Sequence, residues 1–354
     1  MPHFHIAQSW GLDYDEIERR AAEGNGPRYG VPLLVRRLGA KLHQASQCAP
    51  AVSFSDRLRS RLIGIPQTWS FVHDVAPRLG SNDVVYCLDA EVGIPMAAAI
   101  RRKSGRPKLA VYLHNLDRPR GRLASKLLRI ADRIDLFFSC CSSQLEFVRD
   151  YLKVSEDRTF LLLQHVDTRF FSPSPGPPTP GKTRPVVVAV GREQRDYATL
   201  AKATQDLDVD VRIDAWSATA RTQPGMLPRE IPANMSFRQS KPRELVQLYR
   251  DGDVVVVPMF PNKYAGITSL IEGLACERPV VASRTRGLVD YLSPPDGISP
   301  VEPSDPDAMR AAIVRLLEHP EESRVQAHKG YESVDRRYHF ERYIETVASR
   351  VESH

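Results

Sequence analysis

The sequence is poor in cysteine and has no long apolar run. Its five cysteines are an odd number and include the adjacent pair Cys140 and Cys141, which cannot easily bridge each other. A disulfide-stapled secreted domain is therefore not expected, and a reducing cytoplasm fits better. No stretch approaches the roughly 18 apolar residues of a transmembrane helix, and no charged-then-apolar leader is present. We expect a cytoplasmic protein whose membrane contact is at most peripheral, at the inner membrane face.

Several well-known site signatures are also missing. The chain has no Gly-x-x-x-x-Gly-Lys-Ser loop, no Gly-x-Ser-x-Gly elbow, no zinc-finger spacing and no aromatic RNA-binding motif. His3 and His5 alternate on one expected strand, but no third ligand accompanies them, so we predict no metal site. Repeats of about 20 to 50 residues are absent as well, which argues against a solenoid. Nucleic acid is not an expected partner.

Positive charge is concentrated in the first half of the chain. Up to residue 175 there are 25 Lys and Arg against 18 Asp and Glu, whereas the remainder has 24 against 25. The clusters lie at 101–108 and 118–133, and the second is predicted to hold an amphipathic helix over 123–131. Two interpretations stay open for this helix: a solvated basic face, or a face that attracts anionic lipid or an acidic acceptor.

A proline-rich segment divides the chain. Residues 172–182 contain five prolines, which disfavour helix and strand alike and give a stiff extended tether. We predict an N-terminal domain over 1–172, a linker over 173–183, and a C-terminal domain over 184–335. A last helix, within 336–354, is expected to cross back onto the N-terminal domain.

Apolar strand patterns alternate with helical patterns on both sides of this tether. The expected strands are 3–8, 83–88, 108–113, 136–138 and 159–163, then 185–190, 209–215, 235–237, 254–257 and 280–282. The expected helices include 93–102, 123–131, 242–249 and 338–351. Such alternation predicts an α/β fold with two Rossmann-like domains, each built on a parallel sheet, and a cleft between them.

The most informative stretch is 264–283. After the apolar run 254–257 it reads as a small-residue loop, a helix that carries Glu272, and a buried strand introduced by Pro279. A loop at the carboxyl end of a parallel strand is where ligands bind, and the helix N-terminus that follows attracts anions.

This unit resembles the nucleotide-sugar site of retaining glycosyltransferases of family 4 (glycosyl transferases group 1), which have the GT-B fold. The resemblance implies that Glu272 binds the ribose hydroxyls and that the backbone N–H groups of Ala265, Gly266, Ile267 and Thr268 bind the phosphates. A first-turn stabiliser and a ligand-free glycine turn are the structural alternatives. Tyr264 departs from the family, because most relatives have Glu at that position.

The resemblance extends to three further segments. Gly191, Arg192 and Arg195 match the strand-to-helix turn whose cations hold the donor diphosphate, although a pair of surface ion pairs would also explain the two arginines. His114 follows the strand 108–113, where the family has a His near the transferred sugar; a structural His is the alternative. Gly11 remains from the glycine-rich loop that many relatives have near the phosphate.

The function that the resemblance implies is retaining transfer of a sugar from a nucleotide diphosphate sugar, UDP- or GDP-linked, to an acceptor hydroxyl. His114, Arg192 and Arg195 would be the catalytic groups, no cofactor or metal would be required, and the acceptor would be a small molecule, a glycan or a lipid-linked sugar. Two alternatives remain: a non-catalytic GT-B subunit that binds a sugar nucleotide or glycan, favoured by Tyr264, and an epimerase or phosphorylase of similar fold.

Overall fold

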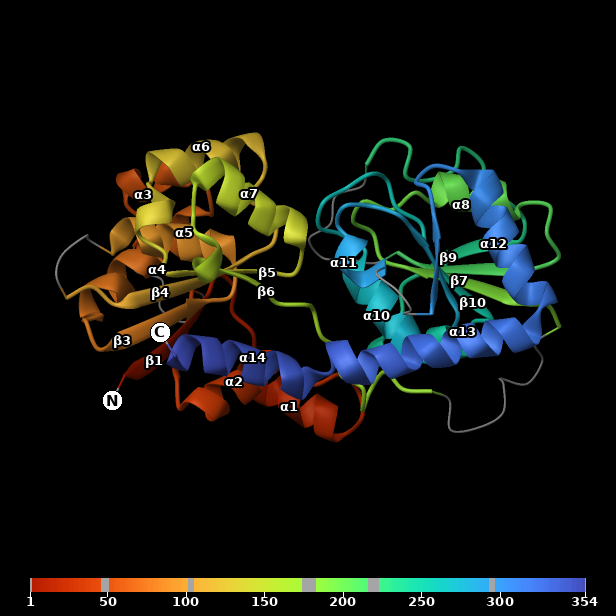
Figure 1. The fold of residues 1–354 in the computed structure, drawn as a ribbon, viewed down its shortest axis with the longest axis horizontal. Helices are drawn as coiled ribbons and strands as arrows, with labels where there is room; N and C mark the ends of the chain where they lie inside the picture. The colour runs from red at the N-terminus through yellow and green to blue at the C-terminus, as the bar shows by residue number, and fades with distance from the viewer. Residues whose placement is uncertain are drawn as a thin grey trace. The chain divides into compact units, whose positions relative to one another are not determined.

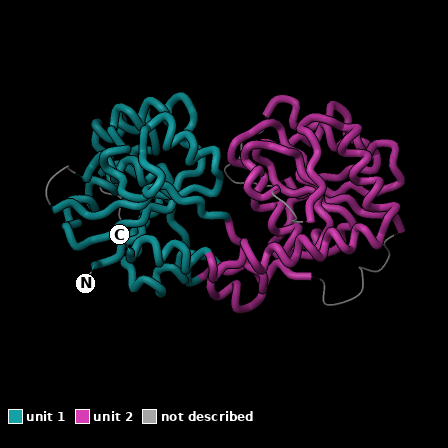
Figure 2. The backbone as a smooth tube through the Cα atoms, in the orientation of Figure 1, with its two compact units in different colours: residues 1–15, 29–163, 343–354 teal, residues 16–28, 164–342 magenta. Residues whose placement is uncertain are grey.

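The chain folds into two compact units, each assembled from separate stretches of sequence (Figure 2). The computed structural model describes residues 2–45, 51–100, 105–173, 183–215, 223–292 and 297–353. Unit 1 holds residues 1–15, 29–163 and 343–354, and unit 2 holds residues 16–28 and 164–342. Most of the predicted linker, residues 174–182, lies outside the described residues, so the predicted domain boundaries stay predictions.

Unit 1 is built on a parallel six-stranded sheet with the order β2-β1-β3-β4-β5-β6 (Figure 1). Its strands are β1 (His3–Gln8), β2 (Lys41–Gln44), β3 (Asp83–Cys87), β4 (Lys108–Leu113), β5 (Leu136–Ser139) and β6 (Thr159–Leu161). Its helices are α2 (Gly30–Leu38), α3 (Phe54–Arg59), α4 (Pro66–Val75), α5 (Ala90–Ala99), α6 (Pro119–Leu127) and α7 (Ser142–Leu152), with short 3-10 turns at Ala76–Arg78, Ile130–Asp132 and Glu156–Arg158.

Unit 2 repeats this plan with the strand order β12-β11-β10-β7-β8-β9, again all parallel. Its strands are β7 (Val186–Val190), β8 (Asp210–Asp214), β9 (Met235–Arg238), β10 (Val254–Val257), β11 (Val280–Ser283) and β12 (Ile298–Val301). Its helices are α8 (Tyr197–Thr204), α9 (Pro242–Asp251), α10 (Ile267–Ala275), α11 (Val289–Leu292), α12 (Pro306–Glu318) and α13 (Pro320–Ser333), followed by a π-helical turn at Val334–Tyr338.

Two helices have residues in both units. They are α1 (Tyr14–Ala22), whose residues from 16 on belong to unit 2, and α14 (Phe340–Glu352), whose residues from 343 on belong to unit 1. The predicted α/β class with two Rossmann-like sheets is confirmed.

Local chemistry explains where the main elements begin and end. β10 consists of four fully buried valines, as expected for a parallel strand covered on both faces. Asp89 caps α5 by accepting a hydrogen bond from Val92 N at 2.9 Å, and Asp196 caps α8 in the same way through Thr199 N. These capped helices begin just after the carboxyl ends of β3 and β7, so they fix the loops at that edge of each sheet.

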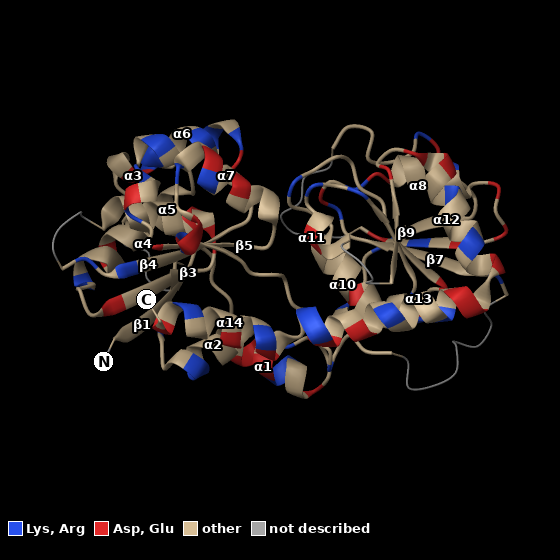
Figure 3. Cartoon of the chain, in the orientation of Figure 1, with Lys and Arg blue, Asp and Glu red and all other residues tan. Residues whose placement is uncertain are grey.

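Several predicted boundaries are wrong. The helix predicted over 93–102 begins at Ala90, because Asp89 provides the cap, and ends at Ala99. The basic helix predicted over 123–131 is α6, from Pro119 to Leu127, since the chain turns at Arg129 with φ 50°. Lys and Arg positions cover much of α6 (Figure 3).

Candidate functional site

The predicted phosphate loop lies where β10 leads into α10. α10 begins at Ile267, and its N-cap is Gly266 with φ 99°, a left-handed conformation that favours glycine. A Cβ on Gly266 would lie 3.1 Å from Met259 Sδ and 3.2 Å from Leu288 Cδ1. Gly266 is therefore required both by its backbone conformation and by tight packing at the start of this helix.

The loop before α10 is shaped by Asn262. Its Oδ1 accepts hydrogen bonds from Tyr264 N at 3.1 Å and from Ala265 N at 2.8 Å, while its own carbonyl accepts one from Gly287 N. The N–H of Ala265, which we predicted to bind phosphate, is thus engaged within the loop. The N-terminal amides of Gly266, Ile267 and Thr268 are the ones that the helix geometry directs outward.

Glu272 lies in the second turn of α10 and is half-buried. Tyr249, a fully buried residue of α9, donates a hydrogen bond from its hydroxyl to Glu272 Oε2 at 2.8 Å. Burial raises the pKa of Glu272 to about 7, although the bond from Tyr249 and the charge of Arg195 act in the opposite direction. Its carboxylate is therefore held in place and is poised to ionise near neutral pH.

Arg195 is buried between the two loops at this edge of the sheet, with 4% of its surface exposed. Its guanidinium donates to Val190 O at 2.9 Å, to Glu193 O at 2.9 Å and to Ser269 Oγ at 2.7 Å. Burial lowers the pKa of Arg195, as expected when a cation is desolvated without a direct carboxylate partner. A fixed positive charge therefore stands beside the first turn of α10.

Gly191 makes room for this guanidinium. It has φ 107°, and a Cβ there would lie 2.4 Å from Arg195 Nη2. The two loops are also joined directly, because Phe260 N donates to Gln194 O at 3.0 Å and Asp196 N donates to Pro258 O at 3.0 Å. Gly191, Arg195 and the start of α10 are thus parts of one packed cluster.

Two other predicted residues stand beside this cluster. Tyr264 is half-buried, and its hydroxyl accepts a hydrogen bond from Gln194 Nε2 at 3.4 Å. Arg192 follows Gly191 directly and is also half-buried. Tyr264 therefore links the two loops with a neutral side chain at the position where the resemblance predicts an acid.

His114 lies in unit 1, directly after β4. Its ring meets that of Tyr112 edge-on with 4.7 Å between centroids. Hydrogen bonds with Cys141 and with His114 lower the pKa of the buried Cys140 thiol. On the neighbouring strand β3, Asp89 follows the carboxyl end, and its carboxylate accepts hydrogen bonds from Ser9 N and Ser9 Oγ. His114 therefore belongs to a polar group at the carboxyl edge of the sheet.

Gly11, the remaining predicted residue, also lies at this edge of unit 1. It follows β1 and lines an open pocket together with residues of β2 and the start of α1. The predicted roles of Gly11, His114 and the residues of unit 2 remain predictions.

Sequence reasoning missed the residues that hold this site together. Tyr249, Asn262 and Ser269 bind Glu272, the loop and Arg195 respectively, and Asp89 binds Ser9 in unit 1. Asn262 had a usable signal, because Asn favours turns in which its side chain bonds the backbone two residues on. The other three bind partners 23 to 80 positions away in the sequence, so no local pattern reveals these contacts.

The described residues show neither a membrane-spanning helix nor a group of metal-ligating side chains. None of the helices they form is both long and apolar enough to span a membrane. In the same parts of the chain, no three His, Cys, Asp or Glu side chains are grouped so that they could hold a metal ion.

A family model matches the part of the chain that contains the cluster in unit 2. Residues 184–319 match the family model described as "Glycosyl transferases group 1". No curated protein gives a significant sequence match.

Solved structures match both units together. A sucrose-phosphate synthase from Thermosynechococcus elongatus has a TM-score of 0.71 at 16% identity, with 99% of this chain and 98% of that chain covered. A UDP-forming trehalose-phosphate synthase from Burkholderia xenovorans gives 0.72 at 13% identity, with 99% of each chain covered. Anabaena HepE in complex with UDP-glucose gives 0.67 at 13% identity, with 99% and 100% covered. At these identities the matches establish the fold.

Proposed function

Since residues 184–319 belong to the glycosyl transferases group 1 family and the whole chain has the GT-B fold, we propose that this protein is a retaining glycosyltransferase that uses a nucleotide diphosphate sugar. The observation that carries the proposal is the cluster in unit 2. There a desolvated guanidinium, Arg195, and the N-terminus of α10 present positive charge near Glu272, whose carboxylate accepts a hydrogen bond from Tyr249.

Each part of this cluster suits one part of the donor. The amides of Ile267 and Thr268 and the cations Arg192 and Arg195 would neutralise the diphosphate, which gathers negative charge as the sugar bond breaks. The Glu272 carboxylate would accept hydrogen bonds from the two ribose hydroxyls. UDP is the nucleotide we favour, because HepE is described with UDP-glucose and the trehalose-phosphate synthase as UDP-forming.

The resemblance to retaining family 4 enzymes implies the course of the reaction. The bond between the anomeric carbon and the β-phosphate oxygen breaks, and the acceptor oxygen bonds the same carbon from the face that the nucleotide leaves. Because attack and departure use the same face, configuration is retained, and the acceptor proton passes to the departing diphosphate. His114 would hydrogen-bond the sugar or the acceptor hydroxyl at the edge of unit 1.

Calorimetric titration with UDP and an assay of UDP release from UDP-glucose test the proposal. Arg192→Ala should weaken UDP binding about tenfold or more, because a charge-assisted bond to phosphate is lost. The exposed Arg229 of the same unit provides the matched control, Arg229→Ala. Equal UDP affinity in both variants would refute the assignment of the diphosphate site.

A non-catalytic sugar-nucleotide-binding subunit is the second candidate, and Tyr264 favours it. Tyr264 cannot offer a carboxylate to a sugar hydroxyl, and its hydroxyl is already bonded to Gln194. The same titration separates the two candidates. A binding subunit would saturate with UDP-glucose yet release no UDP with any acceptor supplied.

We also propose peripheral contact with anionic membrane through α6. Leu123 and Leu127 are 51% and 61% exposed and lie among Arg120 and Lys126, a combination that suits an interfacial helix. Leu123→Ser/Leu127→Ser should reduce co-sedimentation with phosphatidylglycerol vesicles several-fold. Leu227→Ser, at a comparably exposed leucine of unit 2, should leave it unchanged. Equal co-sedimentation of all three proteins would contradict membrane contact through α6.

A further inference from the structure

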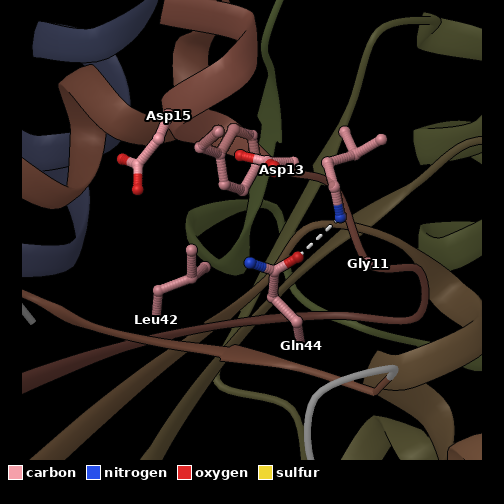
Figure 4. Close-up of a pocket in the computed structure, with 7 residues that line it drawn as sticks. Gly11, Asp13, Asp15, Leu42 and Gln44 are labelled. Atoms are coloured by element: carbon pink, nitrogen blue, oxygen red, sulfur yellow. Dashed lines mark hydrogen bonds between the residues drawn. The ribbon is translucent and has the colours of Figure 1, made fainter.

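Unit 1 has an open pocket of about 640 Å³ at the carboxyl ends of β1 and β2 (Figure 4). Its lining residues come from the loop after β1, the start of α1 and the end of β2. They are Gly11, Leu12, Asp13, Tyr14, Asp15, Leu42 and Gln44. In a parallel sheet this is the edge at which ligands bind.

A network of buried amides forms the floor of the pocket. Gln8 and Gln44 end the two paired strands in register, and Gln8 Nε2 donates to Gln44 Oε1 at 3.0 Å. Tyr14 donates from its hydroxyl to Gln8 Oε1 at 2.5 Å, and Leu12 N donates to Gln44 Oε1 at 2.7 Å. Gln8 has no exposed surface and Gln44 has 4%. The pocket floor is therefore rigid and polar.

One group of this network has no hydrogen-bond partner among the described residues. The amide nitrogen of Gln44 faces the space between Asp13, Asp15 and Leu42, whereas its oxygen bonds Leu12 N (Figure 4). This nitrogen opens to the pocket rather than into the core, so it can exchange water for another hydrogen-bond acceptor. It is therefore a site that a ligand oxygen would satisfy.

The charged groups that line the pocket are both acidic. Asp13 and Asp15 are exposed at its rim, and none of the described lining residues is Lys or Arg. Asp15 is in no ion pair or hydrogen bond with the described residues. Carboxylates accept hydrogen bonds from hydroxyl and ammonium groups and repel phosphate.

We infer that this pocket binds the acceptor, and that the acceptor is a polyhydroxyl molecule, neutral or amine-bearing, that carries no phosphate at this position. The inference rests on the proposed glycosyltransferase function and gives it an acceptor class. The Gln44 amide donates to one acceptor oxygen, and the two carboxylates accept from hydroxyl or ammonium groups at the rim.

This neutral or amine-bearing acceptor differs from the acidic acceptor that the positive charge in the first half of the sequence suggested. None of the basic residues described in unit 1 lines the pocket, although Lys41 begins β2, and the charged lining residues are acidic. It also differs from what two structural neighbours are named for, because those proteins synthesise sucrose phosphate and trehalose phosphate. Selection against phosphate is therefore a property of this chain's own residues.

A matched series of hexoses tests the inference. Glucosamine, glucose and glucose 6-phosphate are titrated into the full-length protein saturated with UDP, and the fluorescence of Trp10 is followed. Trp10 is 39% exposed, and its carbonyl accepts a hydrogen bond from Gln8 Nε2, so it reports on the pocket. A Trp10→Phe variant identifies which part of the signal comes from this residue.

We expect glucosamine to bind at least about tenfold more tightly than glucose 6-phosphate, with glucose between them. Asp13→Asn/Asp15→Asn should bring the affinities for glucosamine and glucose 6-phosphate to within about threefold of each other, by removing attraction and repulsion together. The exposed Asp206 of unit 2 provides a matched control, Asp206→Asn, which should keep the full discrimination.

Two results would overturn the inference: glucose 6-phosphate binding as tightly as glucose, or no hexose changing the Trp10 signal. Calorimetric titration of UDP into the same samples separates this failure from that of the proposed function. If UDP binds while the hexose order is reversed, only the acceptor class is wrong. If UDP does not bind, the glycosyltransferase proposal fails whatever the hexoses do.

Discussion

Glu272 combines two demands that oppose each other. Hydrogen bonds to ribose require an ionised carboxylate, whereas its surroundings favour the neutral acid and raise its pKa to about 7. The bond from Tyr249 and the charge of Arg195 reduce this penalty without removing it. Under the proposed function, the apo protein loses stability while it holds a hydrogen-bond acceptor where the ribose would bind.

Replacing Glu272 separates the two demands. Because its folded-state pKa lies above the usual value, Glu272 lowers the free energy of unfolding as pH rises from about 4.5 to about 7. Glu272→Gln should therefore be more stable than the native protein at pH 8 and similar at pH 4, yet should bind UDP more weakly. Urea unfolding and calorimetry at both pH values measure this. Native UDP affinity that does not fall between pH 8 and pH 6 would contradict the ribose role.

The motif drew attention to Glu272, Gly191 and Gly266, whose binding roles remain predictions, and the structure explains the two glycines. Gly191 and Gly266 have positive φ and lack space for a Cβ, as the pattern of small residues indicated. Tyr249 could not be found in this way. A tyrosine on the apolar face of an amphipathic helix is predicted to be a core residue. Only folding brings its hydroxyl to Glu272.

At the scale of elements, the site depends on two turns that are held together. The turn from β7 to α8 and the turn from β10 to α10 pair through an antiparallel bridge between Arg195 and Met259. Arg195 Nη1 also lies 3.0 Å from Met259 Sδ, and Met259 in turn packs against Gly266. A change in the geometry of either turn should therefore alter the geometry of the other.

Gly191→Ala tests this coupling. Backbone strain should lower the free energy of unfolding by about 1 to 2 kcal/mol. The added Cβ would also displace the Arg195 guanidinium, so UDP affinity should fall as well. Gly225 of the same unit also has positive φ, 78°, but a Cβ there would meet nothing within 4 Å. Gly225→Ala should thus lose similar stability and keep its UDP affinity. Equal affinities would show that Arg195 tolerates the clash.

The sequence indicated the interior strands and two edge strands, β6 and β9, but missed the other two edges. β4 and β10 have the predicted bounds, because runs of buried apolar residues are distinctive. β2 and β12 were missed, and each lies at the edge of its sheet. β2 is short and polar, and β12 contains Pro300, which argues against a strand in sequence although an edge accommodates it.

At the scale of the whole molecule, each unit includes a distant piece of chain. Arg28 reaches Asp167 within unit 2, donating from its Nε at 2.9 Å and from its Nη2 at 2.7 Å. Arg37 binds Glu345 and Glu352 within unit 1. Such ion pairs join segments more than 130 residues apart in the sequence, which composition and periodicity do not reveal.

Two half-buried histidines should make both units sensitive to acid. Burial lowers the pKa of His43 in unit 1 and of His165 in unit 2 to about 4. Each is favoured in its neutral form, so its contribution to the unfolding free energy is complete above pH 6.5 and is lost as pH falls toward 4. Thermal unfolding between pH 7.5 and 4.5 should show this loss.

Variants identify which histidine is responsible. His165→Leu should flatten the pH dependence for unit 2 and His43→Leu for unit 1, whereas the exposed His319 serves as the control in His319→Gln. Unchanged pH dependence in both leucine variants would show that other groups cause the loss of stability.

The interleaved composition of the units also constrains the order of events during protein synthesis. Val347, Ala348 and Val351 of α14 are buried, and the stretch that contains them belongs to unit 1. Although the sheet of unit 1 is complete once residue 161 has been made, a nascent chain cannot cover it with α14 until the ribosome has passed residue 351. For that interval the strands that α14 contacts, through Tyr343 at Tyr86 and Arg350 at Phe160, are exposed to solvent unless a chaperone covers them. A ribosome that stalls in the second half of the message would leave them so.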